Sequence, residues 1–453
     1  MTTGRILARV RTYSSALILG CAATTSIMAA EYAYDVNVGV GHSDNIGRVS
    51  SNEQDETIAA AGLRFSVDQR SRRLEADAIG NFSYAEYLDD TFDSELLGNF
   101  AGTARFAIVP ERLEWLAADN FGQTLNDPFA PATPDNRENI NYFTTGPDVT
   151  FAFGSQTRLR LGARYSLATY EDLPLDFATR SGEAAIVRML SPASELSLNV
   201  RAAQTDYDQA ALNADYDQNE AFVRYDVTGA RTSLALDLGY TEIERESVAD
   251  KESGLLLRLD ATRRLSASST ATLNAGREFS NSGSAFADMQ GIGGIGLVTV
   301  SGRQTAQPFT NTYATLGWDF ARQRTSMNAF VSWVEQSYDA VMAADQTLLS
   351  AGTQLRRELS PATSVIFHAL YTQSDFQQPG ADYDDLNSGL TFGWRISRSV
   401  SLNATYDQLR RSSDGAAGDS TENRVWLSLA YGRGTPRSAP LGPQFSIDQG
   451  LSP

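Results

Sequence analysis

Apolar side chains fall at every second position in one stretch of this chain after another. In residues 31–41, EYAYDVNVGVG, tyrosines and valines share one side of an extended backbone, and small or polar residues share the other. The stretches 158–167 and 234–241 repeat the pattern, with leucine alternating against arginine, aspartate or glycine. A period of two residues is that of a β-strand whose two faces meet different surroundings, not that of a helix.

The pattern predicts about twenty strands of roughly ten residues each, a length that crosses a bilayer when the strand is tilted. The segments expected to form strands are 32–40, 57–67, 74–84, 96–108, 113–121, 140–153, 158–169, 178–190, 196–205, 218–228, 232–243, 252–263, 268–279, 309–320, 325–335, 347–358, 363–375, 385–396, 400–408 and 421–431.

Tight turns and long loops alternate between these segments along the whole chain. Turns such as 110–112, 154–157 and 229–231 are followed by acidic, Gly/Pro/Asn-bearing loops such as 122–139 and 280–308. Outer-membrane barrels have short periplasmic turns and long external loops. We therefore predict an all-β fold, a transmembrane antiparallel up-and-down β-barrel of about 20 strands (18–20), in the bacterial outer membrane with both termini in the periplasm. Its apolar face would contact outer-membrane lipid, and its polar face would line a lumen.

The first thirty residues resemble a secretory signal peptide, with Arg5, Arg9 and Arg11 before a short apolar stretch and small residues at 29–30. Lipidation of Cys21, the sole cysteine of the chain, is an alternative use of this segment. The expected organisation is a signal peptide over 1–30, an outer-membrane barrel over 31–431 and a periplasmic polar tail over 432–453.

The charge balance of the chain is acidic. The sequence has 37 basic and 55 acidic residues; without the three signal arginines it has 34 against 55, a net charge of −21. This balance argues against nucleic acid as a partner. No nucleophile, metal-ligand or phosphate-loop motif is recognisable, and His42 and His368 lack such neighbours in the sequence. We therefore expect no catalytic residue, no metal and no cofactor, and we interpret the protein as not an enzyme.

Aromatic residues gather near the predicted strand ends. Tyrosines, with one phenylalanine, lie near the long loops, and phenylalanine and tryptophan lie near the tight turns. This segregation predicts two aromatic belts at the membrane interfaces. The expected members are Tyr84, Phe121, Tyr142, Tyr170, Tyr207, Tyr240, Tyr338, Tyr371 and Tyr406 at one end, and Phe65, Phe106, Phe153, Phe320 and Trp394 at the other.

Arginines recur on the predicted inner face, which they share with aspartates and glutamates. One interpretation is bracing by charge pairs across the lumen wall; the other is a solute path, because guanidinium groups bind carboxylate, sulfate or phosphate bidentately. Three arginines of one strand have no acid between them and are the strongest candidates. The candidate lumen residues are Arg158, Arg160, Arg164, Arg201, Arg224 and Arg258, with Arg64, Arg105, Arg356, Arg395 and Arg424 also expected on this face.

Two long loops are candidates for narrowing the lumen. The 122–139 loop is stiffened by prolines and by residues able to cap turns, and it either constricts the pore or docks a sugar, or it packs as a structural lid. Its candidate constriction or binding residues are Asp127, Pro128, Phe129, Pro131, Pro134, Asp135, Asn136 and Arg137. The 280–308 loop contains the glycine-rich segment GIGGIGLVTVSG and either folds into the lumen or extends outside.

One part of the chain resembles a known family. The motifs EW at 114–115, DNFGQ at 119–123, DPFAP at 127–131, TPDNR at 133–137, and NYF at 141–143 leading to TGPD at 145–148 are similar to the outer-membrane β-barrel family associated with PEP-CTERM/exosortase and exopolysaccharide gene systems. The segment GHSDN at 41–45 shares this likeness. The resemblance implies an envelope protein of a polysaccharide secretion system and names no catalytic residue.

We therefore expect a porin-like passive channel or an assembly component for polysaccharide export. The alternative is a non-conducting structural or surface-binding barrel whose loops bind polysaccharide or partner proteins. Polysaccharide is one expected partner, and periplasmic export components are expected to contact the C-terminal tail. That tail follows the aromatic Tyr431, which either serves as an internal assembly signal or indicates a different insertion route.

Overall fold

The computed structural model describes residues 30–209, 215–245, 251–289, 299–300, 304–338, 345–415 and 418–434. Residues 1–29 of the expected signal peptide and residues 435–453 of the expected tail lie outside the described residues. So does most of the glycine-rich segment 291–302. In the described part of the chain, no helix is both long enough and apolar enough to span a membrane.

All twenty segments that the alternation predicts are strands in the structure. Their bounds are β1 (Glu31–Ser43), β2 (Glu56–Arg70), β3 (Leu74–Tyr87), β4 (Glu95–Val109), β5 (Leu113–Leu125), β6 (Arg137–Phe153), β7 (Thr157–Tyr170), β8 (Phe177–Ser191), β9 (Ser194–Tyr207), β10 (Tyr216–Thr228), β11 (Thr232–Arg245), β12 (Lys251–Ser266), β13 (Ser269–Ser280), β15 (Phe309–Arg322), β16 (Thr325–Ser337), β17 (Gln346–Glu358), β18 (Thr363–Phe376), β19 (Tyr383–Arg395), β20 (Val400–Ser413) and β21 (Ser420–Arg433).

Three short elements lie in the long loops. They are the 3-10 helix η1 (Pro134–Asn136), the helix α1 (Ser282–Met289) and the two-residue strand β14 (Thr299–Val300). Several strands run beyond their expected ends where they enter long loops; β20, for example, continues to Ser413. The alternation weakens there because these ends project past the part of the wall that has one apolar side.

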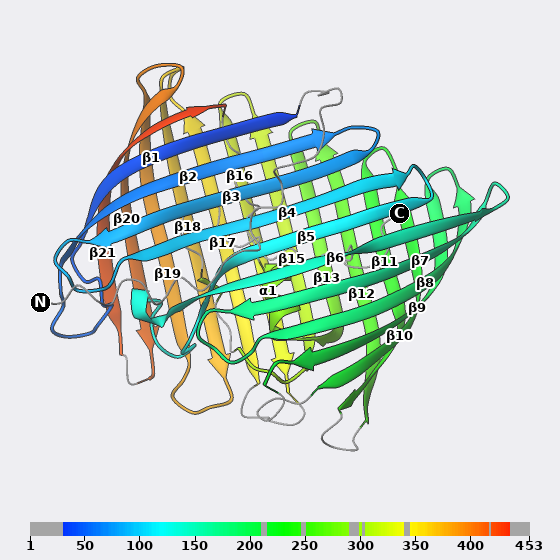
Figure 1. Cartoon of the computed structure of the whole chain (residues 1–453). Helices are drawn as coiled ribbons and strands as arrows, with labels where there is room; N and C mark the ends of the chain where they lie inside the picture. Colours follow the sequence, from blue (N-terminus) through cyan, green and yellow to red (C-terminus); the bar gives the residue numbers. More distant parts are fainter. Residues whose placement is uncertain are drawn as a thin grey trace, which may run out of the picture.

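The sheet closes on itself. Each of the twenty long strands pairs antiparallel with its neighbour in the chain, and β1 pairs with β21 from Tyr34↔Arg433 to Ser43↔Arg424. The first and last strands therefore lie side by side (Figure 1). The result is a 20-stranded up-and-down barrel in which no long strand is left with an open edge, because every neighbour supplies a hydrogen-bonding partner.

The two faces of the wall have opposite chemistry. On β9 the apolar Leu196, Leu198 and Val200 are 39%, 57% and 52% exposed, whereas the polar Ser197 and Asn199 between them are 3% and 2% exposed. A water-soluble sheet protein buries its apolar residues, so this wall is inverted. Its outer face is the apolar surface that a bilayer contacts in outer-membrane barrels.

The predicted tyrosine belt is wrong for four of its members. Tyr142, Tyr170, Tyr207 and Tyr338 are only 6%, 5%, 5% and 1% exposed and belong to an apolar cluster inside the barrel. They occupy inward positions and pack against lumenal side chains instead of meeting the interface. Proximity to a long loop predicted at which end of the barrel these tyrosines lie, but it did not predict whether they point outward or inward. Tyr84, Tyr240 and Tyr406 do point outward, at 48%, 53% and 45% exposure.

Membrane embedding of the outer face predicts that the effect of a charge depends on depth. Leu198→Arg, in the middle of β9, should lower the unfolding free energy in lipid vesicles by about 2–4 kcal/mol. Leu190→Arg is the matched control, since Leu190 is 54% exposed and lies beside the tight turn at 192–193. That change should lower stability by about 0–1 kcal/mol, because a guanidinium near the interface reaches water. Equal losses in urea titrations would contradict the placement.

Candidate functional site

The three arginines of β7 all point into the lumen, but each has its own surroundings. The side chain of Arg164 is 8% exposed and donates two hydrogen bonds to Asp148 of β6, at 2.7 and 2.8 Å. Arg158 pairs with Glu195 of β9, and its side chain is 32% exposed. Arg160 is buried at 6% exposure and has polar interactions of its own. The absence of acids between the three in sequence did not leave them unpaired, because β6 and β9 supply carboxylates to Arg164 and Arg158 and Arg160 has interactions of its own.

Arg164 also compensates for an interruption in the backbone hydrogen bonding between β6 and β7. Pro147 has no N–H, and the β6–β7 pairing omits residues 146 and 147 between Thr145↔Tyr165 and Asp148↔Gly162. The Arg164 guanidinium donates to the carbonyl oxygens of Pro147 and Ala163 at 3.2 and 2.9 Å. It therefore satisfies the backbone oxygens at the interruption, and this geometry explains the Gly-Pro-Asp motif as a structural feature.

The arginines of β9, β10 and β12 form a charge ladder with acids on β10, β11 and β13. Arg224 donates hydrogen bonds of 2.7 and 2.9 Å to the Asp237 carboxylate, and Arg258 lies 3.0 Å from the Glu220 carboxylate. The ladder is completed by Arg201, 4.0 Å from Glu220, and by Glu278, 2.6 Å from Arg258. Three guanidinium groups thus face three carboxylates across five strands.

Phe222 lies at the centre of this ladder. The guanidinium carbons of Arg224 and Arg258 lie 5.9 and 5.7 Å from its ring centroid. Glycine is required at position 239 opposite the ring, since a Cβ there would lie 2.2 Å from the carbonyl oxygen of Ala221 and 2.4 Å from the Cβ of Phe222. The ladder is therefore packed as well as charge-balanced, and most of its atoms are shielded from lumenal water.

Exposure separates the candidate lumen arginines into two groups. Arg160, Arg164, Arg224 and Arg258 have side chains largely covered by protein, and their geometry is that of braces. Arg158 and Arg201 retain 32% and 26% exposure and present part of the guanidinium to the lumen. A solute that passes along this wall would meet those two first.

The β5–β6 hairpin leaves the wall and forms an arm, defined here as residues 122–139. β4 pairs with β5 only as far as Phe121, and β7 pairs with β6 only from Ile140. At the tip, the ring of Phe129 lies 4.9 Å from that of Phe376 at the end of β18. Seven strands separate β5 from β18 along the shorter way around the barrel, namely β1–β4 and β19–β21. The arm therefore crosses the interior (Figure 1).

The loop of the arm has a fixed conformation. The side-chain amide of Asn136 accepts from the Asp127 N–H at 2.7 Å and donates to the carbonyl oxygens of Asp127 and Pro131 at 2.8 and 3.0 Å. Asp127 accepts from the Phe129 N–H at 3.0 Å. Arg137, with a 4% exposed side chain, lies 3.2 Å from Glu95. Asp127 and Asn136 therefore hold the turn as their residue types indicate.

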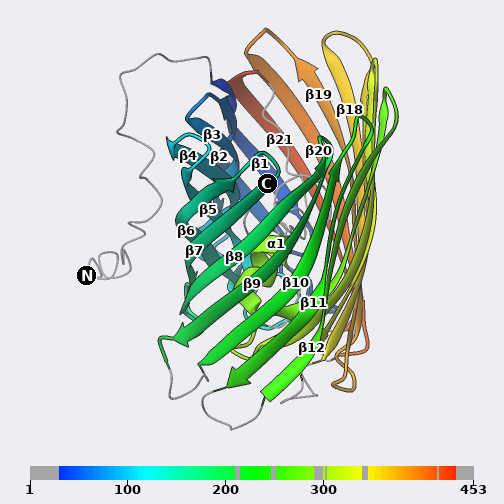
Figure 2. The ribbon, with the colours of Figure 1, turned by 90° about the vertical axis from the view of Figure 1, so that its right-hand side faces the viewer.

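A second segment crosses from the opposite side. α1 follows β13, and both views show it inside the ring of strands (Figures 1 and 2). Phe286 and Ala285 are 0% and 1% exposed in the apolar cluster that includes the inward tyrosines. Gly283 allows this contact, because a Cβ there would lie 2.7 Å from the Phe177 ring. Asn281 donates to the Tyr216 hydroxyl at 2.9 Å.

The two crossing segments meet. β14 pairs in parallel with residues 123–124 of β5, on the edge that β4 leaves free. Of the two arrangements considered for the 280–308 loop, its described residues therefore adopt the lumenal one. The arm and this loop together narrow the interior at the end of the barrel that carries the long loops.

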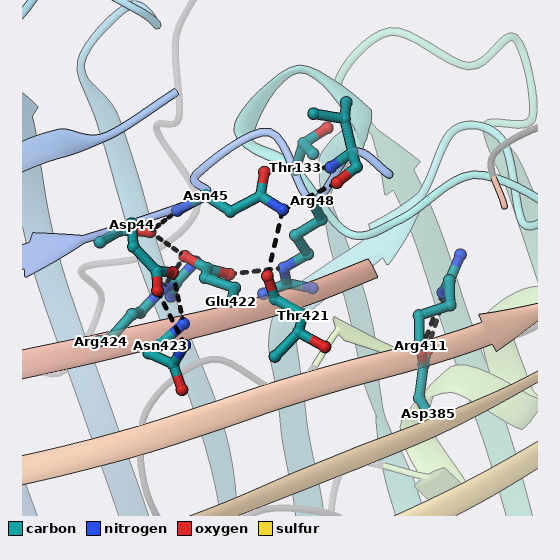
Figure 3. Close-up of polar contacts among 12 residues, drawn as sticks. Asp44, Asn45, Arg48, Thr133, Asp385, Arg411, Thr421, Glu422, Asn423 and Arg424 are labelled. Carbon is teal, nitrogen blue, oxygen red and sulfur yellow. Dashed lines mark hydrogen bonds and ion pairs between the residues drawn. The ribbon is translucent and has the colours of Figure 1, made fainter. Parts of the chain in front are cut away.

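The GHSDN motif locks the closure of the barrel. Beyond the β1–β21 ladder, Ser43 donates to Glu422 at 2.6 Å, and Asn45 donates to the Thr421 carbonyl at 3.1 Å. The Asp44 carboxylate accepts from the Asn423 backbone and side chain, at 2.7 and 2.8 Å. Figure 3 shows the contacts of Asp44 and Asn45 with residues 421 and 423 at this seam.

Glu422 is the hub of that seam. It is fully buried and contacts Arg424 and, at 2.9 Å, Arg48 from the β1–β2 loop (Figure 3). Burial lowers the pKa of the Arg48 guanidinium, and the charge of Glu422 opposes that shift. Sequence reasoning missed Glu422 and Asp44 as partners, because some 380 residues separate the two halves of the seam.

His368 also has a partner that the sequence did not indicate. Its Nε2 lies 3.2 Å from Asp407 of β20, across the intervening β19. Gly389 of β19 makes room, since a Cβ there would lie 2.1 Å from the Asp407 carboxylate. In the part of the chain that the structure describes, no three His, Cys, Asp or Glu side chains gather where they could hold a metal ion. The His368–Asp407 pair therefore connects β18 to β20 across Gly389 of β19.

Comparison with known proteins gives one partial family match. Residues 304–433, from the approach to β15 through β21, match the family described as "Putative beta-barrel porin 2". No curated protein sequence matches the chain.

The solved structures that match the chain resemble it only weakly. A mutant of the ferric enterobactin receptor PfeA from Pseudomonas aeruginosa aligns over 88% of this chain and 80% of its own, at 10% identity and a TM-score of 0.40. The siderophore receptor PirA from Acinetobacter baumannii covers 89% and 80%, at 10% identity and 0.44. The FrpB iron transporter from Neisseria meningitidis covers 88% and 82%, at 7% identity and 0.43. At this low sequence identity, the ligands of these proteins say nothing about the ligand of this chain.

The strand pairing and the inverted wall establish an outer-membrane β-barrel architecture. The family match adds a porin-like character over the C-terminal strands. Together they support a location in the bacterial outer membrane.

The repair role of Arg164 predicts a large loss of stability on its removal. Arg164→Ala should lower the unfolding free energy by about 3 kcal/mol, because it leaves Asp148 without its counter-charge and the carbonyl groups at Pro147 without a donor. The control is Arg180→Ala, whose 62% exposed side chain pairs with Asp206 on the outside and should cost about 0–1 kcal/mol. A double change of Arg164 and Asp148 to alanine should recover part of the loss. Equal effects of the two single changes in urea titrations would refute the repair role.

Proposed function

We propose that this protein is a passive, porin-like passage for polar solutes across the outer membrane and that it serves exopolysaccharide export. The observation that carries the proposal is the pairing of an apolar outer wall with an inner wall of charged groups on β7–β13, where Arg158 and Arg201 face the lumen. Such a lining favours hydrated, polar solutes over apolar ones. No catalytic step is part of the proposal.

The arm and the α1 segment set the expected size limit. Both cross the interior, and they meet where β14 pairs with β5. In the proposal, an extended chain of polar sugar units passes beside them, and folded proteins are held back. The polysaccharide assignment rests on the resemblance carried by the arm and its flanking strands, so it is the finer part of the proposal. The periplasmic placement of both termini, and contacts of residues 432–453 with periplasmic export components, belong to the proposal as well.

A second candidate function is favoured by the same crossing segments. The Phe129–Phe376 contact and the buried Arg137–Glu95 pair anchor the arm at both sides of the lumen. If the interior carries no current, the barrel acts as a scaffold whose loops hold polysaccharide or partner proteins.

Conductance in planar bilayers distinguishes the channel from the non-conducting scaffold. Charge variants then test whether solutes pass Arg158 and Arg201. The wild-type protein should conduct, and Arg158→Gln with Arg201→Gln should shift the reversal potential in a salt gradient towards cation selectivity, because the lumen loses two positive charges. Arg180→Gln with Arg188→Gln is the matched control, since it removes the same charge from exposed outer positions. An absence of current favours the scaffold. A shift of equal size in the control removes Arg158 and Arg201 from the path.

Export itself is tested in cells. Deleting the gene should lower secreted polysaccharide, and a plasmid copy of the wild-type gene should restore it. Replacing residues 127–135 of the arm by a short Gly/Ser link should widen the passage, raising single-channel conductance in bilayers. Unchanged secretion in the deletion strain would reject the polysaccharide assignment but leave the channel proposal standing.

A further inference from the structure

The wall opens between β12 and β13 at the end of the barrel that carries the long loops. These strands pair from Ser266↔Ser269 to Leu257↔Arg277, and the ladder stops there although residues 251–256 and 278–280 continue the two strands. On their other edges the same residues stay paired, with β11 and with β15. The strands part because β12 continues along the wall, whereas β13 leads into α1 inside the ring of strands (Figure 1).

A cavity of about 110 Å³ lies in this opening. Its lining includes Glu252 and Gly254, which share the inward parity of Arg258, and also Ser253 and Leu255, which are exposed on the outer face. Successive residues of a strand point to opposite faces of the sheet, so one cavity can touch both faces only where two strands have separated. The cavity is therefore a notch in the wall, with Ser253 and Leu255 at its outer mouth.

The ring of Phe279 forms the inner end of the notch. Phe279 follows Glu278, whose carboxylate binds the lumenal Arg258, so the strand register places Phe279 on the outer side. Phe279 is nevertheless only 6% exposed and belongs to the apolar cluster inside the barrel. A Cβ on the inward Gly254 would lie 3.9 Å from its ring. The ring therefore turns into the space between the two strands.

Arg277 carries the charge at the mouth that no described carboxylate neutralises. The two carboxylates that line the cavity, Glu252 and Glu278, are already held by lumenal arginines at 2.8 and 2.6 Å. Arg277 also lines the cavity and is exposed, and among the described residues its polar contact is the Thr312 hydroxyl at 3.5 Å. A guanidinium group has five N–H donors, so most of its capacity is open to an anion.

The mouth lies where the outer face changes from apolar to polar. Along β12 the outward residues are leucines as far as Leu255, and beyond it they are Ser253 and Lys251. Tyr240, which pairs with Leu255, is 53% exposed at the same height. Outward aromatic residues at such a boundary mark the membrane interface, where lipid headgroups lie. A lipid whose chains rest on the leucines of β12 would therefore have its headgroup at Arg277.

We propose that the opening between β12 and β13 binds the phosphate-bearing headgroup of a membrane lipid in the leaflet at the long-loop end. Arg277 pairs with the phosphate, because guanidinium and phosphate groups form charge-assisted, bidentate hydrogen bonds. The hydroxyl groups of Ser253, Thr310 and Ser337 also line the cavity and donate to the remaining phosphate oxygens. The site belongs to the outer side of the wall, so it stands whether or not the lumen conducts.

Native mass spectrometry of the purified full-length barrel in a neutral detergent tests the site with two matched lipids. Dioleoyl phosphatidic acid carries the phosphate, and dioleoylglycerol has the same chains without it. The wild-type protein should bind phosphatidic acid about tenfold more tightly, and excess inorganic phosphate should not displace it, because the free ion lacks the chains. Equal binding of the two lipids would overturn the proposal. Displacement by inorganic phosphate would overturn the lipid as the source of the phosphate.

Two variants test the charge and the cavity separately. Arg277→Gln should weaken the binding of phosphatidic acid by about tenfold, because the phosphate loses its counter-charge. Ser253→Leu should also weaken it, because a larger side chain fills the mouth and leaves the charge in place. The matched control is Arg188→Gln: Arg188 is likewise an exposed outer arginine bonded to a threonine hydroxyl, at 2.8 Å, but it lies at the tight-turn end of β8.

The control should bind phosphatidic acid as the wild-type protein does. Heat-dependent gel mobility verifies that each variant is a folded barrel. Unchanged binding in a folded Arg277→Gln or Ser253→Leu variant would refute the proposed site, as would an equal loss in Arg188→Gln.

Discussion

Backbone hydrogen bonding in a medium without water is the constraint on which this structure depends. A β-strand in hydrocarbon must give every N–H and C=O a partner, and a sheet can do so only by closing. Here β1 closes on β21, and the Ser43–Asp44–Asn45 segment continues the closure past the ladder by binding residues 421–423. The first motif of the barrel and its last strand thus form one structural unit.

The same constraint explains the role of Arg164, which the sequence analysis proposed as part of a solute path. Pro147 interrupts a ladder that cannot be left open, and Arg164 reaches the exposed carbonyl groups while Asp148 neutralises it. Arginine suits this place because its planar group donates in several directions at once. A guanidinium group in a lumen is therefore not by itself a sign of solute binding. Its exposed fraction and its partners distinguish a brace from a binding group.

The interior is occupied by segments that enter it from opposite walls. The arm reaches β18 through Phe129, and α1 buries Phe286 among inward tyrosines. Both segments are held by contacts with apolar and aromatic side chains, which a wholly polar lumen would not provide. The apolar cluster at this end of the barrel gives the long loops a folded core of their own. The shape of the passage accordingly depends on loop packing more than on strand number.

The sequence by itself determined the strands, their alternation of faces and the order of turns and loops, because each is a local property of successive residues. It also determined that Arg158, Arg160 and Arg164 face the lumen, since parity along a strand is a local property. Only the tertiary structure decided which acids pair with them, which tyrosines turn inward and where the arm ends. Those contacts join residues such as Ser43 and Glu422 that are far apart in the chain, and they depend on barrel closure, register and the packing of loops in three dimensions.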